Sequence, residues 1–316
     1  MSEAFGFRAF GGPQVQEFFD RPDPVPNPAE VLVRVAAASV NPSDYKLRSG
    51  RAPAFFAGRP FPHVLGAEAA GVVLAVGADV EGLEVGDTVF GSALTGAGTY
   101  ARTTLLLGAN TARKPEGLRD EWAATIPVAA TSALDAVDQL GLPSGATVLI
   151  NGVGGGVGLA TAQVARDRGL NVIGTGSTVK RTLAEAVGVT FVDYTDGDVV
   201  PQVRDLAPVG VDGLVDLVGG QSLRTVAPLA GDPKKVVSVA DPTVSELGGE
   251  MVRRRADRAD LERAAALMVR GRLDPHIVKS YPFSQAAEAL ALVENGHALG
   301  KVVIDMTLTN RTTFGD

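Results

Sequence analysis

The chain has 316 residues, which at roughly 150 residues per domain predicts two domains or one large one. Its net charge of −7 argues against a surface that binds nucleic acid or an anionic membrane, since both need a positive field. It contains no cysteine, which excludes disulfides, thiol nucleophiles, iron–sulfur ligation and every zinc site that needs sulfur.

The first residues and the hydropathy pattern predict a cytoplasmic protein, and the reaction derived below adds a small molecule as its partner. The opening segment, MSEAFGFRAF, carries an acid and lacks the basic region of a secretory signal. No run of about 18 apolar residues is present, so we expect no membrane span. Glycine is the compositional outlier, with 38 residues, roughly 12% against a usual ~7%.

Residues up to about 110 have the pattern of short β-strands. Residues 31–40, 69–76 and 87–91 are apolar and β-branched, and Gly, Pro and Asp separate them. Many short strands with such turns predict a partly open β-barrel rather than a layered α/β unit.

From about residue 120 the sequence alternates between helix-like and strand-like segments. The expected strands are at 147–150, 171–174, 191–194, 211–218 and 234–240. Continuous apolar strands that alternate with helices predict βαβ units in a doubly wound parallel sheet. After them come two amphipathic helices and a closing strand, expected at 260–271, 284–296 and 301–305.

The strand at 147–150 runs into a glycine-rich turn and then into a helix. The turn contains the first cofactor-binding candidates: Gly152, Gly154, Gly155, Gly156, Val157 and Gly158. A pyrophosphate can approach a helix N-terminus only where no Cβ intervenes, and there the free N–H groups and the helix dipole favour an anion. The strand before and the helix after therefore predict a dinucleotide site. The alternative is a tight strand–helix turn that binds nothing.

The end of the next strand indicates which dinucleotide binds. Enzymes that use NAD usually place Asp or Glu there, about 20 residues after the glycines, to bind the ribose 2′-hydroxyl. Residues 169–184 hold no acid but contain Ser177, Lys180 and Arg181, which suit a 2′-phosphate. We therefore predict NADPH, and the alternative is that the two cations only solvate a helix face.

Five segments together point to a family. They are SVNPSDYKLRSG (39–50), FPHVLGAEAAGVVLAVGADVEGLEVGDTVFG (61–91), AATIPVAATSALDAV (123–137), the glycine turn, and GKVVID (300–305). In these segments the chain resembles the zinc-free quinone oxidoreductase branch of the medium-chain dehydrogenase/reductase superfamily. The resemblance implies a GroES-like catalytic domain from residues 1–119 and 256–316 and a Rossmann dinucleotide-binding domain from residues 120–255.

The chain departs from the zinc alcohol dehydrogenases of that superfamily at the metal ligands. Those enzymes carry a Gly-His-Glu motif and ligating cysteines, whereas this chain reads Gly66-Ala67-Glu68 and has no cysteine. We therefore predict no metal site and a structural role for Glu68. Without a metal, the expected reaction is hydride transfer to a quinone or an α,β-unsaturated carbonyl, because conjugation in such acceptors delocalises the incoming charge.

The resemblance places the segment around residue 45 beside the nicotinamide and the substrate. Asn41, Tyr45 and Lys46 are therefore the catalytic candidates, and either Tyr45 or Lys46 is able to donate a proton to the acceptor. The alternative is that Asn41 shapes a turn and that Lys46 is solvated. For Asp44 we expect a helix cap.

Further cofactor candidates come from the resemblance and from positions after later strands, where α/β sheets bind ligands. The resemblance places Thr131 near the nicotinamide and Tyr194 beside the 2′-phosphate. The positions after later strands are Val218, Gly219, Val239 and Ala240. Phe55, Phe56 and Phe61 are candidates for the acceptor pocket, with core packing as the alternative.

Three functions are open on the sequence alone. The first is an NADPH-dependent reductase of quinones or enones, and the second is an enoyl reductase that acts in trans on carrier-bound acyl thioesters. The third is a non-catalytic NADPH-binding protein, because no catalytic triad is evident. Members of the family often dimerise through the edge of the Rossmann sheet, so we expect a homodimer with residues 234–240 at that edge.

Overall fold

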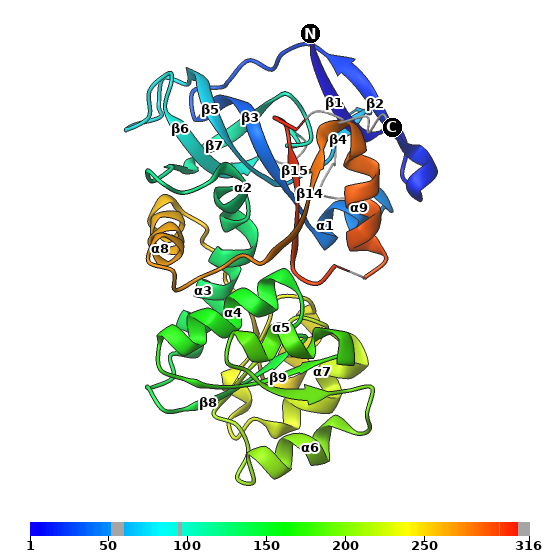
Figure 1. Cartoon of the computed structure of the whole chain (residues 1–316), viewed down its shortest axis with the longest axis vertical. Coiled ribbons are helices and arrows are strands. Elements are labelled where there is room, and N and C mark those ends of the chain that lie inside the picture. The colour runs from blue at the N-terminus through cyan, green and yellow to red at the C-terminus, as the bar shows by residue number, and fades with distance from the viewer. Residues whose placement is uncertain (52–59, 94–96, 297, 309–316) are drawn as a thin grey trace, which may run out of the picture. The chain divides into compact units, whose positions relative to one another are not determined.

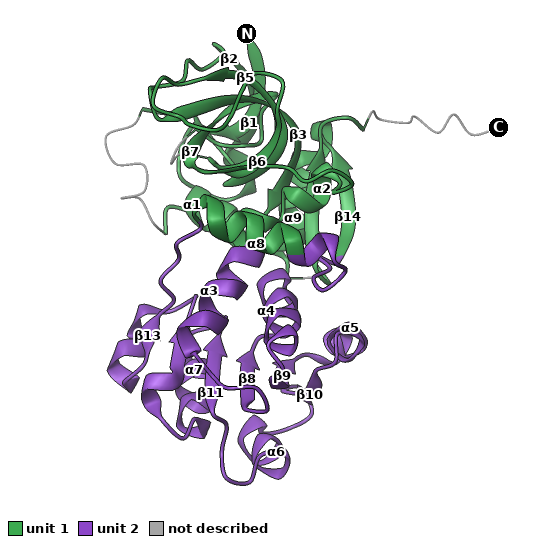
Figure 2. Cartoon of the chain, turned by 90° about the vertical axis from the view of Figure 1, so that its left-hand side faces the viewer, with its two compact units in different colours: residues 1–128, 257–266, 277–316 green, residues 129–256, 267–276 purple. Residues whose placement is uncertain are grey.

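The computed structural model describes residues 1–51, 60–93, 97–296 and 298–308, and the chain divides into two compact units (Figure 2). Unit 1 comprises residues 1–128, 257–266 and 277–316, and unit 2 comprises residues 129–256 and 267–276. Relative to the predicted domains, residues 120–128 fall in unit 1, and residues 256 and 267–276 fall in unit 2. Within the described ranges, no helix has the length and apolar character needed to cross a membrane.

Unit 1 is built around a β-barrel. The long strand β3 (Glu30–Val40) pairs with β5 (Glu68–Val76), β5 with β6 (Thr88–Ala93), β6 with β7 (Thr103–Arg113), and β7 with the first half of β3. All four pairings are antiparallel. Because this cycle closes on itself, the predicted barrel is confirmed.

The C-terminal part of the chain extends the sheet of unit 1 beside the N-terminal part (Figure 1). β15 (Lys301–Asp305, red) pairs antiparallel with the second half of β3 (blue) and parallel with β14 (Ile277–Pro282). A second, three-stranded sheet contains β2 (Gln16–Arg21), β1 (Ser2–Phe7) and β4 (His63–Val64). The helices that lie in or begin in this unit are α1 (Pro42–Arg48), α2 (Asp120–Ala123), α8 (Arg258–Val269) and α9 (Ala286–Glu294).

Unit 2 contains a six-stranded sheet in which every neighbouring pair is parallel. The strand order is β10-β9-β8-β11-β12-β13. The strands are β8 (Thr147–Asn151), β9 (Asn171–Gly176), β10 (Thr190–Asp193), β11 (Gly213–Asp216), β12 (Val236–Ser238) and β13 (Glu250–Met251). This is the strand order of the Rossmann fold, so the predicted doubly wound sheet is confirmed.

Helices connect the strands of unit 2 and bury both faces of the sheet. They are α3 (Thr131–Leu140), α4 (Gly156–Asp167), α5 (Arg181–Ala186), α6 (Val199–Leu206) and α7 (Gly220–Val226). On one face, Leu149 and Ile173 share a core cluster with Val203 of α6 and Leu223 of α7. Side chains alternate along a strand, so Val148 points to the other face. It is fully buried there, and α3 and α4 contact the strands.

Our prediction of the edge strand of this sheet is wrong. We predicted residues 234–240 at the edge, but β12 lies between β11 and β13. The edge strand on this side is β13, which has only two residues, both exposed. A strand of two residues carries no period-2 pattern, so the sequence gives no sign of it. The homodimer stays a prediction.

Candidate functional site

The loop residues predicted to bind the cofactor belong to unit 2 and follow the carboxyl ends of its parallel strands. They are the glycine turn after β8, Ser177 and Lys180 after β9, Tyr194 after β10, Val218 and Gly219 after β11, and Val239 and Ala240 after β12. The strand order reverses between β8 and β11. Since dinucleotides bind where the order of such a sheet reverses, the fold brings these loops to the expected edge.

The glycine turn presents bare backbone at the start of α4. Its N-cap residue, Gly155, makes no side-chain cap, and a Cβ built there would meet no atom within 4 Å. At Gly158, by contrast, a Cβ would lie 2.5 Å from the carbonyl oxygen of Gly152, so the close packing of helix and strand requires glycine. A helix N-terminus that is open in this way fits a pyrophosphate.

Lys180 packs on the same turn. A Cβ at Gly154 would lie 2.5 Å from Cγ of Lys180, so only glycine admits this side chain. Lys180 is half-buried, and burial lowers its pKa. Ser177 precedes it as the N-cap residue of the short helical turn 178–180. A partly desolvated ammonium beside a serine suits a phosphate at the end of β9.

Arg181 and Tyr194 differ in their contacts with the rest of the protein. Nη1 of Arg181 lies 3.3 Å from Glu185, and Nη2 lies 3.8 Å from Asp193. The guanidinium also stacks over the ring of Phe191 at 4.8 Å. Arg181 is therefore packed against β10, whereas Tyr194 is 56% exposed and open to a ligand.

Asp193 is an acid near the predicted 2′-phosphate residues, and we did not predict it from the sequence. It ends β10 beside Gly176 at the end of β9, and this register is not visible in the sequence. Its carboxylate accepts hydrogen bonds from the backbone and the hydroxyl of Thr195, at 2.9 and 2.6 Å. The hydroxyls of Thr195 and Thr178 lower the pKa of Asp193, with a smaller effect of Arg181. Its charge is thus compensated locally.

The loops after β11 and β12 come close to the glycine turn and to each other. Val218 is 54% exposed, and a Cβ at Gly152 would lie 2.7 Å from its Cγ2. Gly219 has a φ of 80°, which favours glycine, and it is the N-cap residue that precedes α7. The N–H of Gly220 donates to the carboxylate of Asp241 at 2.6 Å, which joins the two loops.

Thr131 is a predicted cofactor residue with a buried side chain. It is the first residue of α3, it is fully buried, and its Oγ1 accepts from the guanidinium of Arg254 at 3.4 Å. The neighbouring Arg255 donates to Asp135 from its backbone N–H at 3.0 Å and from Nε at 3.2 Å. These contacts tie the segment 254–255 to α3, and cofactor binding by Thr131 stays a prediction.

Four polar side chains beneath the loops, which we call the polar row, were not predicted from the sequence either. Each is the last or next-to-last residue of its strand: Thr175 in β9, Asn151 in β8, Asp216 in β11 and Ser238 in β12. All four are at most 2% exposed. The available signal was a polar residue near the end of each otherwise apolar strand.

The three catalytic candidates belong to unit 1, on α1 and at its N-cap. Asn41 is the buried N-cap residue, and its backbone N–H donates to Oδ2 of Asp44 at 2.8 Å. The expected capping role of Asp44 is therefore confirmed. Tyr45 packs half-buried against the core cluster that contains Phe7, whereas Lys46 is exposed.

Asp44 also meets a buried phenol. The hydroxyl of Tyr100 donates to Oδ2 of Asp44 at 2.7 Å, and both side chains are buried. Burial raises the pKa of Asp44 to about 6, although the hydrogen bonds from Tyr100 and Asn41 and the charge of Lys301 lower it. Burial, together with the charge of Asp44, holds the pKa of Tyr100 well above its usual range.

The side chain of Asn41 is taken up by a buried ion pair. Its Nδ2 donates to Oε1 of Glu68 at 2.8 Å, and its Oδ1 accepts from Nζ of Lys301 at 2.8 Å. Nζ of Lys301 lies 3.1 Å from Oε1 of Glu68, and the N–H of Val128 donates to Oε2 at 2.6 Å. Glu68 therefore has the structural role that we expected.

The residues around Glu68 do not fit a metal ion. Both carboxylate oxygens already accept hydrogen bonds, and Ala67 supplies no ligand. In the part of the chain that the structure describes, no group of three or more His, Asp or Glu side chains could hold a metal. Four-coordinate zinc sites need at least three protein ligands, so this donor set is insufficient.

Phe61 belongs to an aromatic cluster on unit 1. Its ring centroid lies 4.5 Å from that of His63, 5.4 Å from Phe10 and 5.9 Å from Phe7. Phe61 is nevertheless 40% exposed, so one side of the ring is open to a ligand. The other two acceptor-pocket candidates, Phe55 and Phe56, lie outside the described residues.

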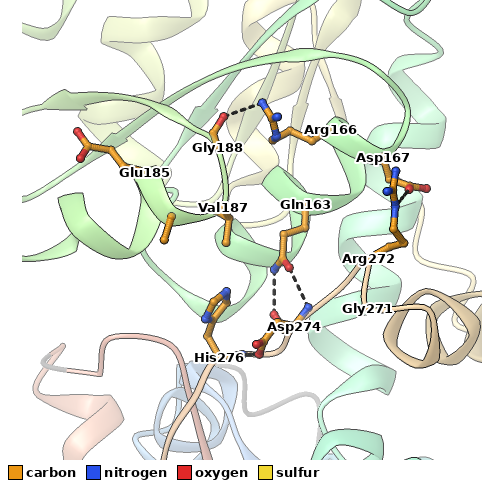
Figure 3. Close-up of a pocket in the computed structure, with 11 residues that line it drawn as sticks. Gln163, Arg166, Asp167, Glu185, Val187, Gly188, Gly271, Arg272, Asp274 and His276 are labelled. Carbon is orange, nitrogen blue, oxygen red and sulfur yellow. Dashed lines mark hydrogen bonds and ion pairs between the residues drawn. The ribbon is translucent and has the colours of Figure 1, made fainter.

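A cavity of about 510 Å³ in unit 2 is formed by α4, the end of α5 and the segment 271–276 (Figure 3). Among the described residues that line it, none is a predicted site residue. Nε of Arg272 pairs with Asp167 at 2.7 Å, and the amide of Gln163 exchanges two hydrogen bonds of 2.8 Å with the backbone of Asp274. These polar groups satisfy one another, and we assign the cavity no function.

Two family models match the chain. The model of the alcohol dehydrogenase GroES-like domain matches residues 27–125, which lie in unit 1. The model described as zinc-binding dehydrogenase matches residues 187–304. The second description names a metal, for which the described side chains offer no ligand set.

The similar proteins include a reductase and an oxidoreductase. The chain is 32% identical to the 2-methylene-furan-3-one reductase of Solanum lycopersicum, over 87% of this chain and 71% of that protein. The solved quinone oxidoreductase of Coxiella burnetii superimposes with a TM-score of 0.88 at 29% identity, covering 96% of this chain and 99% of that one. A mycobacterial protein solved in complex with NADPH superimposes with a TM-score of 0.83 at 26% identity, covering 96% of this chain and 100% of that one.

Proposed function

The chain belongs to the zinc-free quinone oxidoreductase branch of the medium-chain dehydrogenase/reductase superfamily, and we propose that it is an NADPH-dependent reductase of quinones or α,β-unsaturated carbonyls. Membership of the family makes it an NAD(P)H oxidoreductase, and the proposal adds the choice of cofactor and of acceptor. The observation that carries it is the packing of Lys180 on Gly154 beside the open N-terminus of α4.

The loops of unit 2 have complementary parts in binding the cofactor. The backbone at Gly155 and Gly156 binds the pyrophosphate, because no side chain covers the N-terminus of α4. Ser177, Lys180 and Tyr194 bind the adenosine 2′-phosphate. Charge-assisted hydrogen bonds to phosphate are strong, and no carboxylate lies within residues 169–184 to bind a 2′-hydroxyl instead.

The class of acceptor follows from the groups that the chain has for stabilising negative charge during the reaction. NADPH, when bound, supplies a hydride. An acceptor that takes up a hydride also needs a proton, and the negative charge that develops on it must be stabilised. A metal ion stabilises such a charge in some enzymes, but the described residues of this chain include no set of metal ligands. Quinones and enones hold the charge on a conjugated oxygen, so hydrogen-bond donors suffice.

Tyr45 and Lys46 are the proposed proton donors, and Asn41 supports them. Both side chains lie on α1, and Asn41 is the N-cap residue of this helix. Because its amide is bonded to Glu68 and Lys301, Asn41 acts as a positioning residue that holds the start of α1.

The test of the function is NADPH oxidation with a panel of simple quinones, short enones and acyl thioesters, alongside NADPH and NADH affinities by calorimetry. We expect turnover with quinones or enones and much tighter binding of NADPH. Turnover with acyl thioesters alone would replace the proposal by the enoyl reductase, and tight NADPH binding without turnover would replace it by a binding protein.

The proton donor is tested by Tyr45→Phe and Lys46→Met, with Ser43→Ala on the exposed side of the same helix as the control. Loss of a positioned acid typically costs 10²–10⁴-fold in rate, so one of the two variants is expected to fall by about that factor. Unchanged rates in both variants would mean that the proton comes from water.

A further inference from the structure

Asp216 is the residue on which the polar row converges. Oγ1 of Thr175 donates to Oδ1 of Asn151 at 2.9 Å, and Nδ2 of Asn151 donates to Oδ1 of Asp216 at 2.8 Å. From the other side, Oγ of Ser238 donates to Oδ2 of Asp216 at 2.6 Å. A carboxylate only accepts hydrogen bonds, so one buried negative charge sets the direction of the whole row across four strands.

Asp216 also holds the loop that follows its own strand. Its Oδ1 accepts from the N–H of Val218 at 3.2 Å and of Gly219 at 3.1 Å, and Oδ2 lies 3.1 Å from the same nitrogen of Gly219. Hydrogen bonds to an ionised acceptor are stronger than those between neutral groups. The predicted cofactor residues Val218 and Gly219 therefore take their positions from the charge beneath them.

Ser238 connects Asp216 to the loop that follows β12. Because its proton is donated to Asp216, its oxygen is free to accept, and it does so from the N–H of Ala240 at 3.1 Å and of Asp241 at 3.0 Å. Asp216 therefore positions the loop after β12 as well. It does so indirectly, through the hydroxyl of Ser238.

From these contacts we propose that Asp216 is a positioning residue for the nicotinamide half of the cofactor, a role that rests on the proposed binding of NADPH. The two halves of a dinucleotide lie on opposite sides of the point where the strand order reverses. Ser177, Lys180 and Tyr194 lie on the β9 and β10 side and serve the adenosine half. The loops held by Asp216 lie on the β11 and β12 side and serve the nicotinamide half.

Asp216→Asn tests this role, because it keeps the shape of the side chain and turns one acceptor into an NH₂ group that faces donors. We expect the Kd of NADPH to rise about tenfold or more, and the Kd of adenosine 2′,5′-bisphosphate to stay within about twofold. The second ligand lacks the nicotinamide half, and both constants are measured by calorimetry. An equal loss for both ligands, or no loss for NADPH, would overturn the proposal.

Two further variants control this experiment. Asp212→Asn removes an exposed carboxylate that accepts from the N–H of Thr147 at 2.7 Å at the other end of the sheet, and it should change neither constant. Ser238→Ala serves if Asp216→Asn does not fold. It should raise the Kd of NADPH by a smaller factor than Asp216→Asn does and leave the Kd of adenosine 2′,5′-bisphosphate unchanged. A change in both constants, or in neither, would overturn the role.

The outcomes also separate this inference from the proposed function. Wild-type protein that does not bind NADPH would overturn both. Tight binding by the wild-type protein, with normal binding by Asp216→Asn or Ser238→Ala, would overturn only the positioning role and leave the reductase in place.

Discussion

The ammonium group of Lys301 lies 3.1 Å from Oε1 of Glu68, and the two side chains are 4% and 0% exposed. Glu68 begins β5 and Lys301 begins β15, so the pair joins segments that are 233 residues apart in the chain. Removing one member of a buried pair leaves an uncompensated charge in the interior, which costs more than the pair itself contributes.

Lys301→Met should therefore destabilise the protein strongly. We expect the free energy of unfolding to fall by about 3–5 kcal/mol, measured by urea denaturation, and to recover largely in the double variant Glu68→Gln/Lys301→Met. Glu3→Gln is the control, because its pair with Arg102 is 3.6 Å long and exposed, and it should cost at most about 1 kcal/mol. A similarly small effect of Lys301→Met would contradict the interpretation.

Asp44 should make the stability depend on pH. Burial raises its pKa from 3.8 to about 6, so the folded protein binds this proton more tightly than the unfolded chain does. The contribution of Asp44 is then fully present below about pH 4 and is lost as the pH rises through about 6. Unfolding free energies across this window should fall less steeply for Asp44→Asn than for the wild-type protein.

Tyr100→Phe is the companion variant for this measurement. It removes a hydrogen bond that lowers the pKa of Asp44, so the fall in stability should move to higher pH. Glu68, which raises this pKa, and Lys301, which lowers it, are unchanged in the experiment. Identical pH profiles for the wild-type protein and both variants would exclude Asp44 as the titrating group.

Lys180→Met should reduce the preference for NADPH over NADH. The loss of a charge-assisted bond to the 2′-phosphate predicts a Kd for NADPH that is about tenfold to a hundredfold higher, with little change for NADH. Lys234→Met removes an exposed lysine of the same unit and serves as the control. If both cofactors lost affinity equally, Lys180 would not bind the 2′-phosphate.

Two alanine substitutions in the glycine turn should affect different properties, stability in one case and NADPH binding in the other. Gly158→Ala places a Cβ 2.5 Å from a backbone oxygen, so we expect it to cost about 1–3 kcal/mol of stability. Gly155→Ala meets no atom and should change stability by less than about 1 kcal/mol, yet weaken NADPH by covering the N-terminus of α4.

Gly231→Ala is the matched control, since its Cβ would approach no atom closer than 3.9 Å in a loop away from the turn. We expect it to change neither the unfolding curve nor the Kd of NADPH. Normal NADPH binding by Gly155→Ala would show that the pyrophosphate does not approach the helix at that residue.

The features that the sequence predicted well depend on neighbouring residues. The closing strand at 301–305 and the turn at 152–158 are where we expected them, because a short run of apolar residues and a glycine cluster between strand and helix act within a few residues. The capping role of Asp44 is local in the same way, since it accepts from the N–H three residues before it.

The features that we missed depend on which strands lie side by side. Asp193 comes next to Gly176 only through the pairing of β10 with β9, and β13 covers the edge that we had given to β12. The polar row needs the registers of four strands at once.

The amino-acid sequence by itself determined the family, the two folds, the glycine turn and the absence of thiol chemistry, because these follow from composition and short-range pattern. Only the tertiary structure decided that Asn41 is bound into the ion pair of Glu68 and Lys301, and that Asp216 lies beneath the loops of the proposed cofactor site. The physical reason is that buried charges are stabilised by donors from distant segments, and a chain must fold before those donors meet them.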